Sequence, residues 1–157
     1  MGQGNWQQVL DANRLAFMNE FVTRAEFVAL YPTTDTPTQY VDKLYQHAHV
    51  TGTQQERLDA IAYFGGAATA ADTGARARAL LRVTQSGDFQ AREANRTFVQ
   101  IEYFGYLRRN PNDPPDNNFN GFNFWVNKMN QFNGDFLQAE MVKAFLASLE
   151  YRSRFGQ

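Results

Sequence analysis

The chain has 157 residues, of which 43% are hydrophobic and 15% aromatic, with a formal net charge of −1 at pH 7. This is typical of one domain, or of two small units, with a hydrophobic core. The charge gives no reason to expect nucleic acid as a partner, and no apolar run reaches the roughly 20 residues of a membrane span. Because cysteine is absent, disulfides, thiolate catalysis and Cys-ligated metals are excluded.

Apolar spacing predicts helices in the first half of the chain, and the alternation typical of strands is nearly absent. The first helix covers residues 5–22, and Thr23-Arg24-Ala25-Glu26 has the sequence of a capping box that begins a short second helix. Thr36-Pro37 predicts another helix start. A second capping box at 53–56 begins a helix that ends at Gly65-Gly66.

The second half repeats this organisation after a connection rich in Ala, Thr and Gly. A helix resumes near Thr73 and is interrupted at Ser86-Gly87-Asp88. A strongly apolar helix is predicted for residues 95–108, followed by a Pro/Asn/Asp loop over 110–118. Two further helices follow, and a turn at Asn133-Gly134-Asp135 separates them.

One local pattern occurs three times at equal spacing. The copies are Phe17-Met18-x-x-Phe21-x4-Glu26-Phe27, Ala79-Leu80-x-x-Val83-x4-Asp88-Phe89 and Met141-Val142-x-x-Phe145-x4-Glu150-Tyr151. The acids are separated by 88 − 26 = 62 and 150 − 88 = 62 residues. Such regularity indicates a tandem array of one helical unit, in which each unit buries the apolar face of its neighbour.

We therefore predict an all-α protein of about seven to nine helices in tandem units. Residues 1–35 are the closing helices of a truncated first unit, and 36–93 and 94–157 are two further units. Tyr40-Val41-x3-Tyr45 resembles Phe98-Val99-x3-Tyr103 at an offset of 58, so one unit contains additional loop residues.

Three segments of the last unit form a series that resembles a known family. They are Tyr103 to Pro111, Asp116 to Trp125 and Ala144 to Arg152. Their pattern is an aromatic-rich helix, an Arg-x-Pro-x-Asp loop, a Gly-x-x-x-Trp helix and a closing Phe-x-x-Ser-x-Glu-Tyr. The series resembles an all-helical bacterial domain family of unassigned function, found in exported, surface-layer-type proteins, and its end is similar to phycobilisome linker domains. The resemblance implies a noncatalytic module.

The Pro/Asn/Asp loop contains a candidate calcium site. Asp116-x-Asn118-x-Asn120-Gly121 matches the first half of a calcium-loop pattern, but Asn127 stands where a bidentate Glu is needed. The expected ligands are Asp113, Asp116, Asn118, Asn120 and the carbonyl of Phe122. So few charges predict low affinity, on the order of 10⁻⁴–10⁻³ M. The other interpretation is that these residues cap a helix and form turns, and no cofactor is required.

Other chemically active residue types do not form a recognised constellation. Glu26, Asp88 and Glu150 are expected at helix starts, where an acid is favoured, rather than as a glycosidase pair. His47 and His49 are two residues apart and would point about 200° apart on a helix, so they cannot share a metal. The arginines at 108–109 and at 76, 78 and 82 are expected in solvent or in ion pairs.

These observations favour a noncatalytic structural or protein-interaction module of a secreted or cell-surface bacterial protein, which binds other domains or copies of itself. The low Lys content and the abundance of Asn and Gln favour export. The alternative is a calcium-dependent carbohydrate-binding module that uses the 113–127 loop and exposed rings such as Phe119 and Phe124. A hydrolase is the third hypothesis, and no acid, base and nucleophile converge to support it.

Overall fold

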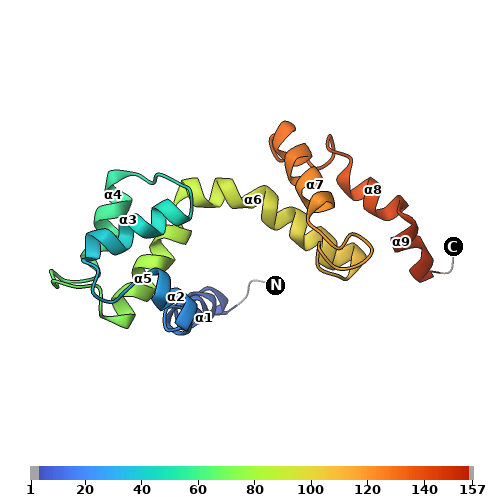
Figure 1. Ribbon diagram of the computed structural model, residues 1–157. Coiled ribbons are helices and arrows are strands. Elements are labelled where there is room, and N and C mark those ends of the chain that lie inside the picture. Colours follow the sequence, from blue (N-terminus) through green and yellow to red (C-terminus); the bar gives the residue numbers. More distant parts are fainter. Residues whose placement is uncertain (1–3, 156–157) are drawn as a thin grey trace. The chain divides into compact units, whose positions relative to one another are not determined.

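The computed structural model describes residues 4–155. These residues form nine α-helices, one π-helix and one short 3₁₀ helix, and no strand occurs among them, which confirms the predicted all-α class (Figure 1). The chain divides into two compact units, Met1–Gln90 and Ala91–Gln157. No helix in the described part of the chain combines the length and the apolar character needed to cross a membrane.

The first unit contains five helices and the beginning of a sixth. They are α1 (Trp6–Phe21), α2 (Ala25–Leu30), α3 (Pro37–His47), α4 (Gln54–Ala62), α5 (Thr73–Thr84) and the first residues of α6 (Gly87–Glu102). The capping box predicted at Thr53 is confirmed: its hydroxyl accepts from the Glu56 backbone N–H, and the Glu56 carboxylate accepts from the Thr53 N–H. Thr36 caps α3 in the same way with Gln39, as its position before Pro37 suggests.

The capping box predicted at Thr23 is wrong. Arg24 is the residue that precedes α2, and no side chain caps this helix. The Thr23 hydroxyl instead donates to the carbonyl oxygen of Glu20, so it closes the end of α1. A Thr two residues beyond one helix and two before the next has hydrogen-bonding groups within reach on both sides, and here the preceding carbonyl is the partner.

The core of the first unit is built on one face of α3. Tyr40, Val41, Leu44 and Tyr45 are all at most 3% exposed. They pack against Phe27 of α2, which stacks on Tyr31 with ring centres 4.4 Å apart, and against the alanine-rich face of α5. Helix α5 contacts α1, α3 and α4 (Figure 1), so it is the central element of this unit.

A buried arginine on α5 closes this core. Arg76 is 2% exposed, and its guanidinium donates to the carbonyl oxygens of Ala70 (3.0 Å) and Tyr31 (2.7 Å). The same group lies over the ring of Tyr40, at 4.6 Å from the ring centre, and the Tyr40 hydroxyl donates back to the Arg76 carbonyl. Burial lowers the pKa of the guanidinium from its ordinary value. The expectation that this arginine lies in solvent is therefore wrong.

We predict that Arg76→Met lowers the free energy of unfolding by roughly 2–4 kcal/mol, because two buried carbonyl oxygens lose their donors. Arg78→Met is the matched control, since Arg78 is exposed and its guanidinium lies over the Tyr63 ring. The control should change stability by about 0.5 kcal/mol or less. Urea unfolding followed by circular dichroism measures both, and equal losses would contradict a special role for Arg76.

The second unit has its own core. After α6 come the π-helix Tyr103–Leu107, α7 (Asn120–Gln131), α8 (Met141–Ala147), α9 (Leu149–Arg152) and the 3₁₀ helix Ser153–Phe155. Apolar residues of α6, the π-helix, α7 and α8 are buried together, namely Val99, Tyr103, Leu107, Phe122, Val126, Met129, Met141 and Phe145. The helix predicted for 95–108 begins earlier, at Gly87, and changes to π geometry for its last turn.

Glu102, the last residue of α6, has an unpaired buried oxygen. Its Oε2 has no hydrogen-bond partner among the described residues, and burial raises the pKa of the carboxyl above its ordinary value. A group whose pKa is higher in the folded than in the unfolded chain costs stability as the pH rises from its unfolded pKa through its folded pKa.

We therefore expect Glu102→Met to stabilise the protein by roughly 1 kcal/mol at pH 7, because the variant has no carboxylate to bury. The gain should shrink as the pH falls below the ordinary glutamate range near 4.5, where both states bind the proton. Urea unfolding of both proteins at pH 4 and pH 7 measures the difference. A gain that does not depend on pH would show that packing, not ionisation, is responsible.

The three copies of the repeated pattern adopt the same local structure. Each is the end of one helix, a break and the start of the next, and Glu26, Asp88 and Glu150 lie in the first turns of α2, α6 and α9. This confirms the expected position of the acids at helix starts.

The change of offset from 62 to 58 also has a structural location. Residues 31–36 separate α2 from α3, whereas the corresponding part of α6 is continuous helix. The loop that includes Pro32 therefore accounts for this difference, since 40 − 26 = 14 and 98 − 88 = 10. The second unit has four additional residues after position 98, since 150 − 98 = 52 and 88 − 40 = 48.

Candidate functional site

The segments 103–111, 116–125 and 144–152 are organised around Arg109. Arg108 ends the π-helix in the left-handed conformation (φ 54°), which turns the chain into the 110–118 loop. The side chain of Arg109 is only 11% exposed. It is therefore surrounded by the loop and by the start of α9.

The Arg109 guanidinium donates hydrogen bonds to oxygen atoms of three segments. It makes a two-pronged ion pair with Glu150, from Nε to Oε1 (2.7 Å) and from Nη2 to Oε2 (3.1 Å). Nη2 also donates to Oδ2 of Asp116 (2.7 Å). Nη1 donates to the carbonyl oxygens of Asn110 (3.1 Å), Pro111 (3.4 Å) and Asp113 (3.2 Å). One cation thus ties the irregular loop to the closing helix.

The electrostatics of this centre keep the arginine charged. Hydrogen bonding to Glu150, followed by that to Asp116, raises the pKa of Arg109 above its ordinary value, although burial opposes the shift. The guanidinium also lies 5.2 Å from the centre of the Tyr103 ring, and burial raises the pKa of the Tyr103 hydroxyl. Neither group therefore exchanges a proton near neutral pH.

Two of the residues predicted as calcium ligands, Asp113 and Asp116, bind this cation. Oδ2 of Asp116 binds Arg109, and Oδ2 of Asp113 accepts from the backbone and side-chain N–H groups of Asn110 (2.8 and 3.0 Å). Asn118 uses Oδ1 to accept from the Asn120 backbone N–H (2.7 Å). Asn120 is the first residue of α7, and Phe122 lies in its first turn with its side chain 5% exposed.

A positive charge therefore already occupies the centre of the loop. Within residues 4–155 there is no group of three or more His, Cys, Asp and Glu side chains placed to hold a metal ion. Carboxylate and carbonyl oxygens that would suit Ca²⁺ point to Arg109 instead. The calcium site stays a prediction, and an ion bound here would compete with the guanidinium.

Three other residues of these segments, Gly121, Ser148 and Trp125, also pack or bind within this unit. A Cβ on Gly121 would lie 2.8 Å from the Tyr103 hydroxyl, so a side chain at 121 would collide with the ring beneath Arg109. Ser148 caps α9 by accepting from the Tyr151 backbone N–H (3.1 Å). Trp125 packs edge-on against Phe145, with ring centres 5.7 Å apart. The residues that carry the resemblance thus serve to close one helical unit.

The first unit makes a related contact with different chemistry. Asp88 accepts a hydrogen bond from the backbone N–H of Gly52 (2.9 Å). Residue 52 corresponds to 110 at the offset of 58, and Asp88 corresponds to Glu150 at the offset of 62. In both units, the acid of the repeated pattern therefore binds the segment that follows an aromatic helix, which is α3 in the first unit and the π-helix in the second. In the first unit a backbone amide is the donor, and in the second Arg109.

Other sequence candidates have structural partners. Nδ1 of His47 lies 2.9 Å from the Tyr31 hydroxyl, and the two rings are in contact. His49, two residues after the end of α3, has a left-handed backbone conformation (φ 52°). Arg82 pairs with Glu56 and Asp59, which agrees with the expected ion pairs. Arg109 also makes ion pairs as expected, with Asp116 and Glu150, but its burial and its hydrogen bonds to the loop carbonyls were not predicted.

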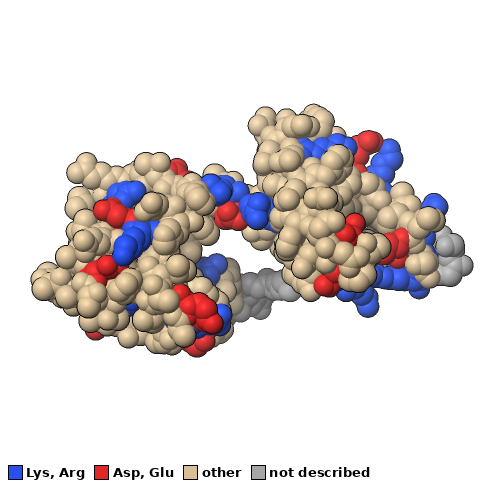
Figure 2. Space-filling model, in the orientation of Figure 1, with Lys and Arg blue, Asp and Glu red and all other residues tan. Residues whose placement is uncertain are grey.

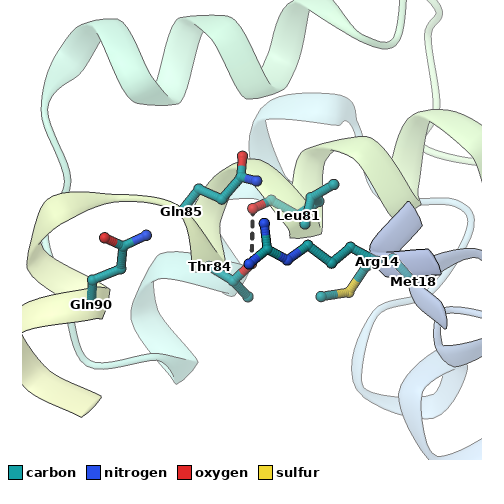
Figure 3. A pocket seen from close by; sticks show the side chains of 6 residues that line it. All are labelled: Arg14, Met18, Leu81, Thr84, Gln85 and Gln90. Carbon is teal, nitrogen blue, oxygen red and sulfur yellow. Dashed lines mark hydrogen bonds between the residues drawn. The ribbon is translucent and has the colours of Figure 1, made fainter. Parts of the chain in front are cut away.

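A cavity of about 420 Å³ lies between α1 and α5 (Figure 3). It is lined by Arg14, Met18, Leu81, Thr84, Gln85 and Gln90. The Thr84 hydroxyl is bonded to the Leu81 carbonyl (2.8 Å), and Arg14 is paired with Asp11. The lining combines a guanidinium, a hydroxyl and two amides with the apolar side chains of Met18 and Leu81.

Comparisons with protein families, with curated proteins and with solved structures find no match to this chain.

We predict that Arg109→Lys lowers the free energy of unfolding by roughly 1–3 kcal/mol, because an ammonium cannot bridge two carboxylates and three carbonyl oxygens in one plane. Arg108→Lys is the matched control at the adjacent, exposed position and should change stability by about 0.5 kcal/mol or less. Thermal and urea unfolding test both variants. A loss confined to Arg108→Lys would show that the cation at 109 does not hold the unit together.

We expect millimolar Ca²⁺ to leave the melting temperature unchanged, because an ion would have to displace Arg109 from Asp116. Scanning calorimetry with Ca²⁺, with Mg²⁺ and with EDTA provides the measurement. A rise specific to Ca²⁺ that disappears in Asp116→Asn would instead establish the calcium site indicated by the loop sequence.

Proposed function

We propose that this protein is a noncatalytic structural and protein-interaction module built from helical repeats. The observation that carries the proposal is the use of the recognised residues: Arg109, Gly121, Ser148 and Glu150 all bind or pack within their own unit. Groups held in this way supply stability and shape rather than chemistry.

The surface supports a role in binding other proteins. Large apolar side chains are exposed on both units, including Phe17 (53%) and Leu30 (60%) on the first and Leu137 (73%) and Leu149 (83%) on the second. Figure 2 shows that uncharged residues make up most of the visible surface of each unit, with both signs of charge interspersed. Apolar groups on this scale favour contacts with proteins over a wholly solvated surface.

The proposed setting is a secreted or cell-surface bacterial protein. This rests on the family resemblance and on the low Lys content of the chain. The proposed partners are other domains, or copies of the chain that associate through exposed helix faces.

Carbohydrate binding is a second candidate, favoured by one observation. Phe119 and Phe124, before and within the first turns of α7, are 50% and 57% exposed, and such rings stack on sugars.

Affinity capture from the envelope and culture-fluid fractions of the producing organism tests the interaction role. The bait is the full chain, compared with a Leu146→Asp/Leu149→Asp variant that places charge on an exposed face of the second unit. We expect a protein that is enriched by the wild type, lost with the variant, and able to bind again when both components are purified. Equal recovery by both baits, together with turnover of a glycan substrate, would contradict the proposal.

A further inference from the structure

The first copy of the repeated pattern lacks a cover that the other two copies have. Phe17 of α1 corresponds to Ala79 of α5 and to Met141 of α8, at offsets of 62 and 124 residues. Ala79 and Met141 are both 0% exposed, whereas Phe17 is 53% exposed. The same position is therefore a core position in two copies and a surface position in the third.

The acid of the first copy also lacks its partner. Asp88 accepts from the Gly52 N–H, and Glu150 accepts two hydrogen bonds from Arg109. Glu26 lies in the first turn of α2 and is exposed, and among the described residues no hydrogen bond to its carboxylate is found. The nearby charge of Arg24 is engaged by Glu20, at 2.9 and 3.1 Å.

The two complete copies show what covers these positions. Helix α5, which carries Ala79, packs against α1, α3 and α4 of its own unit. Met141 of α8 is buried in one cluster with Tyr103 of the π-helix and Val126 of α7. In both units, an aromatic helix that comes earlier in the chain belongs to the surrounding core, and a residue beyond that helix donates to the acid. Phe17 and Glu26 stand at the corresponding positions of the first copy, where Arg24 lies over the Phe17 ring at 5.9 Å from its centre and its charge acts on that of Glu26.

The face of α1 around Phe17 is suited to a helix. Trp6, Leu10 and Phe17 are 51%, 36% and 53% exposed. Their spacing of four and seven residues places them on one side of the helix. Leu15 and Met18, on other sides of α1, pack into the core of the first unit. Phe21, four residues after Phe17, also packs against this core, and its ring centre lies 5.7 Å from that of Phe17.

We propose that α1 and α2 form a docking site for a helix–loop segment of this same repeat type, supplied by another polypeptide. Its chemistry is an amphipathic helix with aromatic apolar positions, followed by a loop that carries an arginine. Arginine is favoured over a backbone amide because Glu26 has the longer side chain of Glu150, which binds Arg109, rather than that of Asp88, which binds Gly52. This inference rests on the proposed interaction function and names its surface and partner.

The test uses the intact chain and a labelled synthetic peptide of residues 94–119, which contains the aromatic helix and the Arg109 loop. Fluorescence anisotropy should show saturable binding. Phe17→Asp in the intact chain should weaken binding by about tenfold or more, since it charges the apolar face. Phe124→Asp is the matched control: it removes an aromatic ring of similar exposure (57%) on the second unit and should leave binding unchanged.

A second pair of changes tests the ion pair directly. Glu26→Gln in the chain and Arg109→Ala in the peptide should each weaken binding several-fold, and the two together should weaken it no more than either alone. Circular dichroism melts of each chain variant establish that the fold is retained, as expected for two exposed side chains.

Three outcomes would overturn the inference. These are absence of saturable binding, binding that is insensitive to Phe17→Asp, and additive effects of the Glu26 and Arg109 changes. A concentration-dependent dimer of the chain, lost in Phe17→Asp but retained in Glu26→Gln, would also overturn it by showing that a second copy covers α1. Each result leaves the capture experiment on the second unit unaffected, so failure here is distinguishable from failure of the proposed function.

Discussion

Carbonyl oxygens in the irregular segments of a small helical protein need donors, and arginine supplies them in both units of this chain. Arg76 serves the carbonyls of Tyr31 and Ala70 in the first unit, and Arg109 serves those of Asn110, Pro111 and Asp113 in the second. A guanidinium has five N–H donors in one plane, so a single side chain can satisfy several oxygens that no helix or sheet can reach. The loops keep their shape because these cations hold them.

The two arginines differ in how their charge is balanced. Arg109 is neutralised by Glu150 and Asp116, and hydrogen bonding to these acids raises its pKa. Arg76 lies against the rings of Tyr40 and Phe27, and burial lowers its pKa. They occupy unrelated positions in the repeat, since 76 + 62 gives Gln138 and 109 − 58 gives Thr51. The helices and the acid at the start of the closing helix recur between the copies, whereas the donor that satisfies the loops has changed.

Much of the secondary structure is predictable because it depends on neighbouring residues. Thr36 and Thr53 cap helices through groups three residues away. The helix expected to end at Gly65-Gly66 already ends at Ala62, and the two glycines lie in the turn that follows it. Thr23 shows the limit of such local rules, because its hydroxyl had partners on both sides and bound the preceding carbonyl. The calcium-loop pattern has the same limit, because it contains the possible ligand Asp116 but not Arg109, whose guanidinium binds that carboxylate.

The sequence by itself determined the all-α class, the repeated pattern and the place of its acids at helix starts, because apolar spacing and capping act over a few residues. Only the tertiary structure decided which charges are buried and what they bind. Arg76 and Arg109 looked like ordinary surface arginines, and each acquires its role from residues up to 45 and 41 positions away. Whether a side chain faces solvent or a carbonyl oxygen depends on how distant segments pack, and no local pattern encodes that.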